Sequence, residues 1–137
     1  MANPPQAIRD RAGAGSRSPT LSQIAAAAAF DGHDEMEGVK HGYEENRRIL
    51  VEGLPKAGID RFLPVDGAFY LYADVSHFTD DSFDFAGRML EQAGVAATPG
   101  IDFDPVHGKH FIRFSYARSA ADMREAVERI GAWLSRG

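Results

Sequence analysis

The first half of the chain has apolar residues at three- and four-residue spacings, which is the pattern of amphipathic helices. A capping serine and a first-turn proline open a predicted helix over residues 18–30. Asp31-Gly32 interrupts the pattern, and a longer helix is predicted over residues 33–56, with Gly58 as its stop. The apolar stripe of this long helix consists of Met36, Val39, Tyr43, Leu50 and Leu54.

Two further helices are predicted in the second half of the chain. Residues 80–94 have an acidic, serine-containing start and a glycine stop, and their apolar positions are Phe85, Met89 and Leu90. Ser119, with Asp122 three residues later, caps a final helix. The buried stripe predicted for that helix is Met123, Val127, Ile130 and Leu134.

Alternating and continuous apolar runs predict the strands. RFLPV (61–65) and AFYLYADV (68–75) flank Asp66-Gly67, a tight-turn signal, and Pro64 places the first of these strands at a sheet edge. VAATPG is a short strand that ends in a turn, followed by a polar loop, IDFDPVHGKH. The run FIRFSYA (111–117) has the strongest strand pattern in the chain.

Together these elements predict an α+β fold. Helices pack on a small, largely antiparallel sheet that a long helix precedes. A chain of 137 residues can build one sizeable core and leaves no room for a second full domain. No repeat or low-complexity tract interrupts this order.

Composition excludes several classes of function. A net charge of -5 with no block of Lys and Arg argues against a nucleic-acid partner. The absence of Cys excludes disulfides and thiolate metal sites and suits a cytoplasmic location. The longest apolar run, residues 24–30, is too short to span a membrane. Residues 1–15 lack a secretory signal and are expected to form a disordered leader.

Arg113 lies at the centre of the FIRFSYA run and is the main candidate for a binding residue. Strand geometry places it on one face with Phe111 and Ser115, while Ile112, Phe114 and Tyr116 share the other. A guanidinium among apolar neighbours needs an anion, either an internal Asp or Glu or the carboxylate of a ligand. Chemistry alone leaves both possibilities open.

Other polar clusters carry weaker signals. Asp102, Asp104, His107 and His110 have spacings that metal ligands can use, although a solvated turn is the favoured interpretation and no metal site is predicted. His33 and His41 are interpreted as surface residues, and Asp80-Asp81 as a helix start. No carboxylate pair, nucleophile turn or glycine-rich phosphate loop with catalytic character is found, so no catalytic residue is assigned.

Four motifs in a fixed order identify a family resemblance. The motifs are, in order, SPTLSQIAAAAAF, PVDGAFYLYADVS, AGVAATPGIDFDP and FIRFSYA, followed by an amphipathic helix. With these motifs the chain resembles the C-terminal part of pyridoxal-phosphate-dependent aminotransferases. The family is class I and II, fold type I, similar to aspartate aminotransferase. The resemblance covers residues 16–137. It implies that residues 16–32 are the last helix of the large domain and residues 33–137 the small domain.

The resemblance also implies roles for individual residues. Arg113 matches the arginine that binds the α-carboxylate of the amino-acid substrate, and Gly67 matches a glycine at the substrate cleft. The segment from Thr98 to Asp104 resembles one that lines the same cleft. The substrates of such an enzyme are an amino acid and a 2-oxo acid, exchanged by amino-group transfer.

The residues that would perform the chemistry are not recognised. The family's reaction needs a lysine that forms a Schiff base with pyridoxal phosphate. None of Lys40, Lys56 and Lys109 resembles that motif, and all three are interpreted as solvated. The resemblance therefore implies pyridoxal phosphate in the parent enzyme, none bound by this chain alone, and no catalysis by the isolated chain.

A second interpretation is a binding or protein-interaction module derived from that domain. The first two helices would then expose apolar faces that favour self-association, and the family itself is dimeric. Neither the substrate side chain nor the oligomeric state follows from the sequence.

Overall fold

The computed structural model describes residues 20–136. The predicted leader, residues 1–15, and the start of the first predicted helix lie outside the described residues. The chain divides into two compact units, residues 1–37 and 38–137. The assignment of residues 16–32 and 33–137 to the two domains of an aminotransferase stays a prediction.

The first unit contains helix α2, Thr20–Ala28, continued by a 3-10 turn over Ala29–Asp31. The backbone N–H of Gly32 donates to the carbonyl of Ala29 at 3.2 Å and closes this turn, so the predicted break at 31–32 is confirmed. Helix α3, His33–Gly53, follows. None of the residues of α2 is buried.

Helix α3 ends three residues before the predicted Lys56. Pro55 has no N–H to donate, and the residue before a proline avoids helical geometry, so the chain leaves the helix in a series of turns. Gly58 completes them with φ of 102°, a conformation that side chains with a Cβ rarely adopt. The glycine therefore terminates the turns rather than the helix itself.

The sheet in the second unit has three antiparallel strands in the order β1-β3-β2. Their bounds are Tyr70–Asp74 for β1, Thr98–Pro99 for β2 and Phe111–Ser115 for β3. The strand predicted from FIRFSYA is the central one. The predicted small antiparallel sheet is confirmed, with shorter strands than the patterns indicated.

The strand predicted over residues 61–65 is wrong. Only a single bridge forms there, between Phe62 and Ala73. Beyond it the ladder does not continue, because the carbonyl of Val65 accepts from Nε of Arg47 on α3. The predicted tight turn at Asp66-Gly67 is also wrong, since the bridge leaves a long connection. Tyr116 holds that connection, its hydroxyl donating to the carbonyls of Gly67 at 3.3 Å and Ala68 at 3.2 Å.

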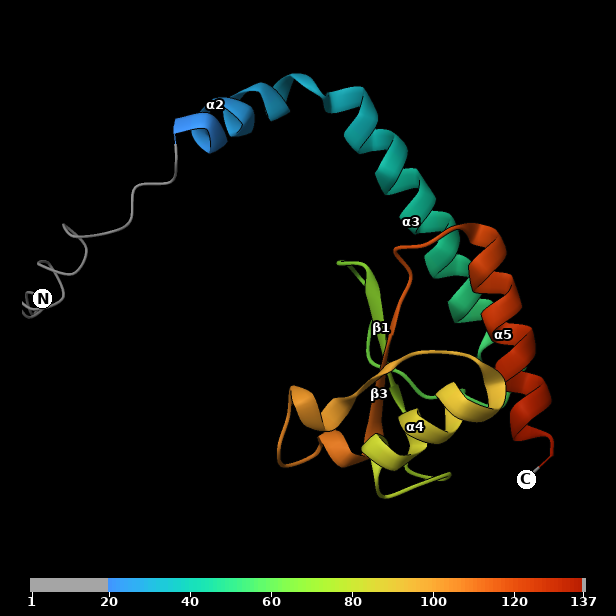
Figure 1. Cartoon of the computed structure of the whole chain (residues 1–137). Coiled ribbons are helices and arrows are strands. Elements are labelled where there is room, and N and C mark those ends of the chain that lie inside the picture. Colours follow the sequence, from blue (N-terminus) through green and yellow to red (C-terminus); the bar gives the residue numbers. More distant parts are fainter. Residues whose placement is uncertain (1–19, 137) are drawn as a thin grey trace, which may run out of the picture. The chain divides into compact units, whose positions relative to one another are not determined.

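Helices α4, Ser82–Ala93, and α5, Ala120–Leu134, lie where the sequence predicts them (Figure 1). The Asp81 carboxylate caps α4 by accepting from the backbone N–H groups of Phe83 and Asp84. Gly94 ends α4 in the left-handed conformation, and the Ser119 hydroxyl accepts from the N–H of Asp122 to cap α5. Among the helices that the structure describes, none combines the length and apolar character needed to cross a membrane.

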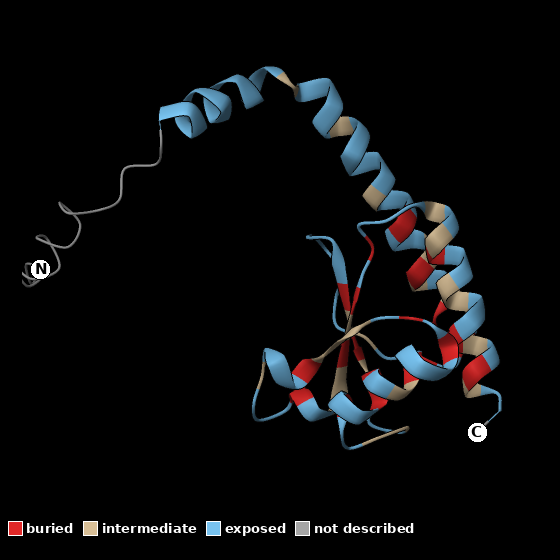
Figure 2. Cartoon of the chain, viewed as in Figure 1, coloured by how far each residue is buried: buried red, intermediate tan, exposed pale blue. Residues whose placement is uncertain are grey.

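The core lies between one face of the sheet and the helices of the second unit, where buried residues gather in Figure 2. The C-terminal half of α3 lies beside α5 (Figure 1). Arg124 of α5 pairs there with Glu45 of α3 at 2.7 Å. The buried side chains include Leu50, Leu54, Leu71, Ile112, Phe85, Met89 and Ile130. The predicted stripe of α3 is buried only at its C-terminal end, because Met36 and Val39 are 50% and 54% exposed.

Candidate functional site

Arg113 lies in the middle of β3, on the sheet face away from the core. Its neighbours along the strand, Ile112 and Phe114, point into the core and are 0% and 5% exposed. Tyr72 of β1 and Thr98 of β2 lie opposite Arg113 in the sheet register. The pattern of alternation therefore places the guanidinium as the sequence predicts, on the face that the helices leave uncovered.

Two aromatic rings hold the guanidinium of Arg113. Its central carbon lies 4.3 Å from the ring centroid of Phe103 and 5.3 Å from that of Tyr70. Both distances are within the range of cation–π attraction. A long contact of 3.5 Å joins Nη2 to the hydroxyl oxygen of Thr98. These neighbours orient the guanidinium without neutralising it.

No internal acid neutralises Arg113 within the described part of the chain. None of the ion pairs among residues 20–136 includes it. Its Nε atom is buried and has no hydrogen-bond partner. Because a half-buried cation with an unsatisfied N–H is costly, the arrangement favours an added anion. Of the two partners that the sequence left open, the described residues supply no Asp or Glu.

The loop that carries Phe103 is fixed by a close approach of two glycines. A Cβ on Gly100 would lie 2.5 Å from the carbonyl oxygen of Gly108 and 2.7 Å from that of Phe111. The Tyr72 hydroxyl donates to the carbonyl of Gly100 at 3.3 Å, and its ring stacks on Phe111 with 4.9 Å between centroids. Burial, with the charge of Asp104 as a smaller cause, raises the pKa of Tyr72 and keeps it a donor.

Asp104 organises the next turn of that loop. Its carboxylate accepts from the backbone N–H groups of Val106 at 2.9 Å and His107 at 3.0 Å. These bonds, that of His107 first, hold the pKa of Asp104 below its usual value. Its second oxygen lies 3.2 Å from Nδ1 of His107. The cluster acts as a turn, as the sequence favoured.

Asp102 and His110 do not join Asp104 and His107 in a metal site. Within residues 20–136, no group of three or more His, Asp or Glu side chains is placed to hold a metal ion. Nδ1 of His110 is buried without a partner. His41 pairs with Glu44 on the exposed side of α3, and His33 is also exposed.

Gly67 lies in the connection before β1, where its carbonyl accepts from the Tyr116 hydroxyl. A Cβ built there meets no described atom within 4 Å. The described residues therefore leave room for a side chain at position 67, whereas they leave none at Gly100 and Gly108. The role of Gly67 at a substrate cleft stays a prediction.

Sequence reasoning did not find Tyr70 and Phe103 as the neighbours of Arg113. Phe103 lies in the segment from Thr98 to Asp104, which the family resemblance assigns to the cleft without a role for any single residue, and no spacing rule connects it to β3. The three lysines, Lys40, Lys56 and Lys109, are exposed on α3, on the turns after it and on the 3-10 turn before β3.

Comparisons with known proteins identify the family of this chain. The family described as "Aminotransferase class I and II" matches residues 6–130. The match begins within the segment 1–15, so the resemblance extends further toward the N-terminus than the motifs indicated. A valine–pyruvate aminotransferase from Mycobacterium tuberculosis is 51% identical over 118 residues, which are 85% of this chain and 30% of that protein.

Further relatives are also aminotransferases. An aspartate/prephenate aminotransferase from Thermus thermophilus is 34% identical over 97% of this chain and 35% of its own length. The crystal structure of an aminotransferase from Mycobacterium tuberculosis superposes with a TM-score of 0.84 at 50% identity, over 87% of this chain and 31% of that one. The chain thus spans about a third of the length of these relatives. With the family's sequence pattern across most of its residues and the family's fold in its sheet and helices, this chain belongs to the class I and II aminotransferases.

Proposed function

We propose that this chain provides the substrate-carboxylate site of a pyridoxal-phosphate-dependent aminotransferase. Arg113 would bind the α-carboxylate of an amino acid or a 2-oxo acid. The observation that carries the proposal is a guanidinium held between two rings with no described carboxylate as its partner. An arginine so placed can offer two parallel N–H groups to one carboxylate.

The neighbours of Arg113 would help it in two ways. Tyr70 and Phe103 lie within cation–π distance of the guanidinium and would hold it in place for a carboxylate. They would also displace water from part of its surface, which strengthens the attraction to an anion. Thr98 offers a hydroxyl beside Nη2. Gly67 remains a second candidate at the same cleft on the family resemblance.

The name of the relative at 51% identity suggests suitable probes. That protein is described as a valine–pyruvate aminotransferase. We propose valine and pyruvate as members of the substrate class, since both carry the α-carboxylate that Arg113 would bind. Pyruvate is the better first probe because it has no ammonium group that needs a partner.

The experiment titrates the full chain with pyruvate while backbone amides are followed by nuclear magnetic resonance. We expect saturable shifts centred on β3 with a millimolar dissociation constant. Arg113→Gln should weaken binding at least about tenfold, the cost of one charged hydrogen-bonding group. Arg118→Gln is the matched control, an exposed arginine paired with Asp122 at 3.5 Å. Equal binding by Arg113→Gln and the parent chain would refute the role of Arg113.

Transamination by the isolated chain is not part of the proposal. Pyridoxal phosphate needs a lysine shielded from water and a cradle for its phosphate, whereas Lys40, Lys56 and Lys109 are all exposed. The residues described here therefore do not fit that cofactor. Mixed with pyridoxal phosphate, valine and pyruvate, the purified chain should form no alanine. Turnover of any amino acid under these conditions would contradict this.

A second candidate function is self-association, favoured by the exposed apolar residues of the first unit. Leu21, Ile24 and Phe30 are 79%, 63% and 82% exposed. Size-exclusion chromatography with light scattering should show oligomers that Ile24→Glu reduces and Ser22→Glu, on the same helix, does not. A monomeric parent chain at high concentration would exclude this function.

A further inference from the structure

A hollow lies where α4 and α5 meet, apart from the sheet face that carries Arg113. Its volume is about 650 Å³, within the range of small-molecule sites. Residues of α4, the end of α5 and the segment after β1 line it. The lining combines aromatic rings with cationic side chains and includes no carboxylate.

Three aromatic rings form the apolar part of this hollow. The ring of Phe85 lies 5.1 Å from that of Trp133 at an interplanar angle of 57°. Phe78 stacks on Phe85 with 6.0 Å between ring centroids and an interplanar angle of 22°. Phe85 and Trp133 are 1% and 8% exposed, so their positions are fixed by the core. The wall is rigid, and an added flat ring could stack or pack edge-on against it.

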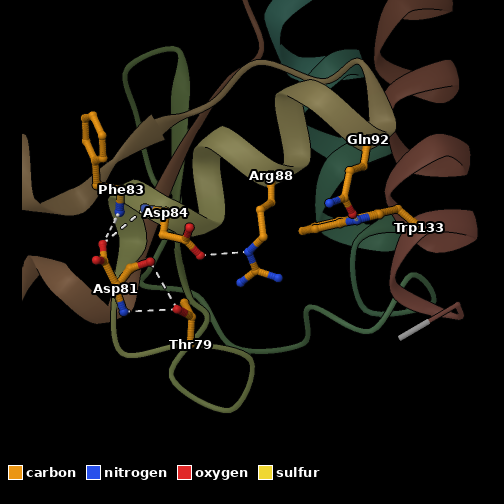
Figure 3. Close-up of polar contacts among 7 residues, drawn as sticks. All are labelled: Thr79, Asp81, Phe83, Asp84, Arg88, Gln92 and Trp133. Carbon is orange, nitrogen blue, oxygen red and sulfur yellow. Dashed lines mark hydrogen bonds and ion pairs between the residues drawn. The ribbon is translucent and has the colours of Figure 1, made fainter.

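Polar groups at the rim are oriented by contacts that leave donors available. The indole N–H of Trp133 donates to Oε1 of Gln92 at 2.8 Å, which fixes the amide of Gln92 beside the indole (Figure 3). Arg88 lies above the Phe85 ring at 5.7 Å and donates from Nε to Asp84 at 2.7 Å. Nη1 and Nη2 of Arg88 have no hydrogen-bond or ion-pair partner among the described residues.

The two arginines that line the hollow, together with the carboxylate paired to one of them, carry one net positive charge. Arg88 and Arg136 contribute one each, and Asp84, bound to Arg88, removes one. Arg136 donates from Nε to the carbonyl of Ala132 at 2.9 Å and pairs with no described carboxylate. His77 also lies in the lining. This balance complements a monoanion better than a doubly charged phosphate.

We propose that this hollow binds a small aromatic carboxylate. The flat ring of the ligand would pack against Phe78 and Trp133, and its carboxylate would accept from the terminal nitrogens of Arg88 and Arg136. The amide nitrogen of Gln92 is a further donor at the rim. This site is independent of Arg113 and of the proposed aminotransferase function.

Trp133 gives a direct readout, because it is the only tryptophan in the sequence. The experiment records Trp133 fluorescence of the full chain during titration with phenylacetate. We expect a saturable change, and at least about tenfold weaker binding for Arg88→Gln and for Arg136→Gln. Arg129→Gln is the matched control, since Arg129 is an exposed arginine of α5 paired with Glu125 outside the hollow. Its variant should bind phenylacetate like the parent chain.

A neutral probe, a smaller probe and one further variant test whether both the ring and the charge of phenylacetate are needed. Phenylacetamide, which keeps the ring and loses the charge, and acetate, which keeps only the charge, should both bind at least about tenfold more weakly. Arg113→Gln should keep the full response, which would distinguish this site from the carboxylate site on β3. A linear response, equal binding of phenylacetamide, or equal losses in Arg129→Gln would each overturn the proposal.

Discussion

Replacing Gly100 with alanine should destabilise the second unit through one methyl group. The added Cβ would lie 2.5 Å from both the Gly108 carbonyl oxygen and the Tyr72 hydroxyl, and 2.7 Å from the Phe111 carbonyl oxygen. Ordinary carbon–oxygen contacts are about 3.3 Å or longer. Two of the three atoms belong to the backbone, so a side-chain rotation cannot relieve the overlap.

The expected cost combines strain with a lost hydrogen bond. Overpacking of this kind costs about 1–3 kcal/mol. The bond from the Tyr72 hydroxyl to Gly100 contributes about 0.5–1.5 kcal/mol more if the loop shifts. A free energy of unfolding lower by about 2–4 kcal/mol moves the urea midpoint down by about 1–2 M when the urea dependence is near 2 kcal/mol/M.

Urea unfolding followed by Trp133 fluorescence measures this change. Gly87→Ala is the matched control, because Gly87 lies on the exposed side of α4 and a Cβ there meets nothing within 4 Å. That variant should be more stable by about 0.5–1 kcal/mol, since alanine favours a helix. If Gly100→Ala unfolded at the same urea concentration as the parent chain, the steric argument for the loop would fail.

Three other predictions concern the same unit. Phe103→Leu should weaken pyruvate binding several-fold while Phe103→Tyr retains it, because a ring over Arg113 is needed; equal affinities in the magnetic resonance titration would contradict this. The pKa of Asp104 in the folded chain should lie below its ordinary value of 3.8. The ionised carboxylate then stabilises its turn at neutral pH, and this stabilisation is lost as the pH falls through the folded-state pKa. A titration that gave Asp104 a pKa of 3.8 or higher would disprove this. Asn46→Ala should lower the free energy of unfolding by about 1–3 kcal/mol, because the buried amide donates to the carbonyls of Tyr116 at 2.9 Å and Arg118 at 2.6 Å; a urea midpoint equal to that of the parent chain would rule this out.

The helices of the second unit could be predicted from the sequence because their signals are local. Asp81, Gly94 and Ser119 act on backbone groups within a few residues of themselves. A cap therefore needs no information about the rest of the chain. The central strand was predictable for a similar reason, since alternation along β3 decides which side chains enter the core.

Predictions failed where a distant segment decides the outcome. Residues 61–65 have the composition of a strand, yet the carbonyl of Val65 accepts from Arg47 of α3, so the ladder stops after one bridge. The apolar stripe of α3 predicts one continuous buried face. Only its C-terminal part packs against α5 and the sheet. Burial depends on which partner is present, and periodicity carries no information about that.

The sequence by itself determined the order of the elements, the face of β3 on which Arg113 lies and, through four ordered motifs, the aminotransferase family. Only the tertiary structure decided what surrounds that arginine. Tyr70, Thr98 and Phe103 reach it from β1, from β2 and from a loop fixed by Gly100 against Gly108. A strand's alternation is set by its own backbone, whereas the neighbours of a guanidinium are set by the folding of remote segments onto one sheet face.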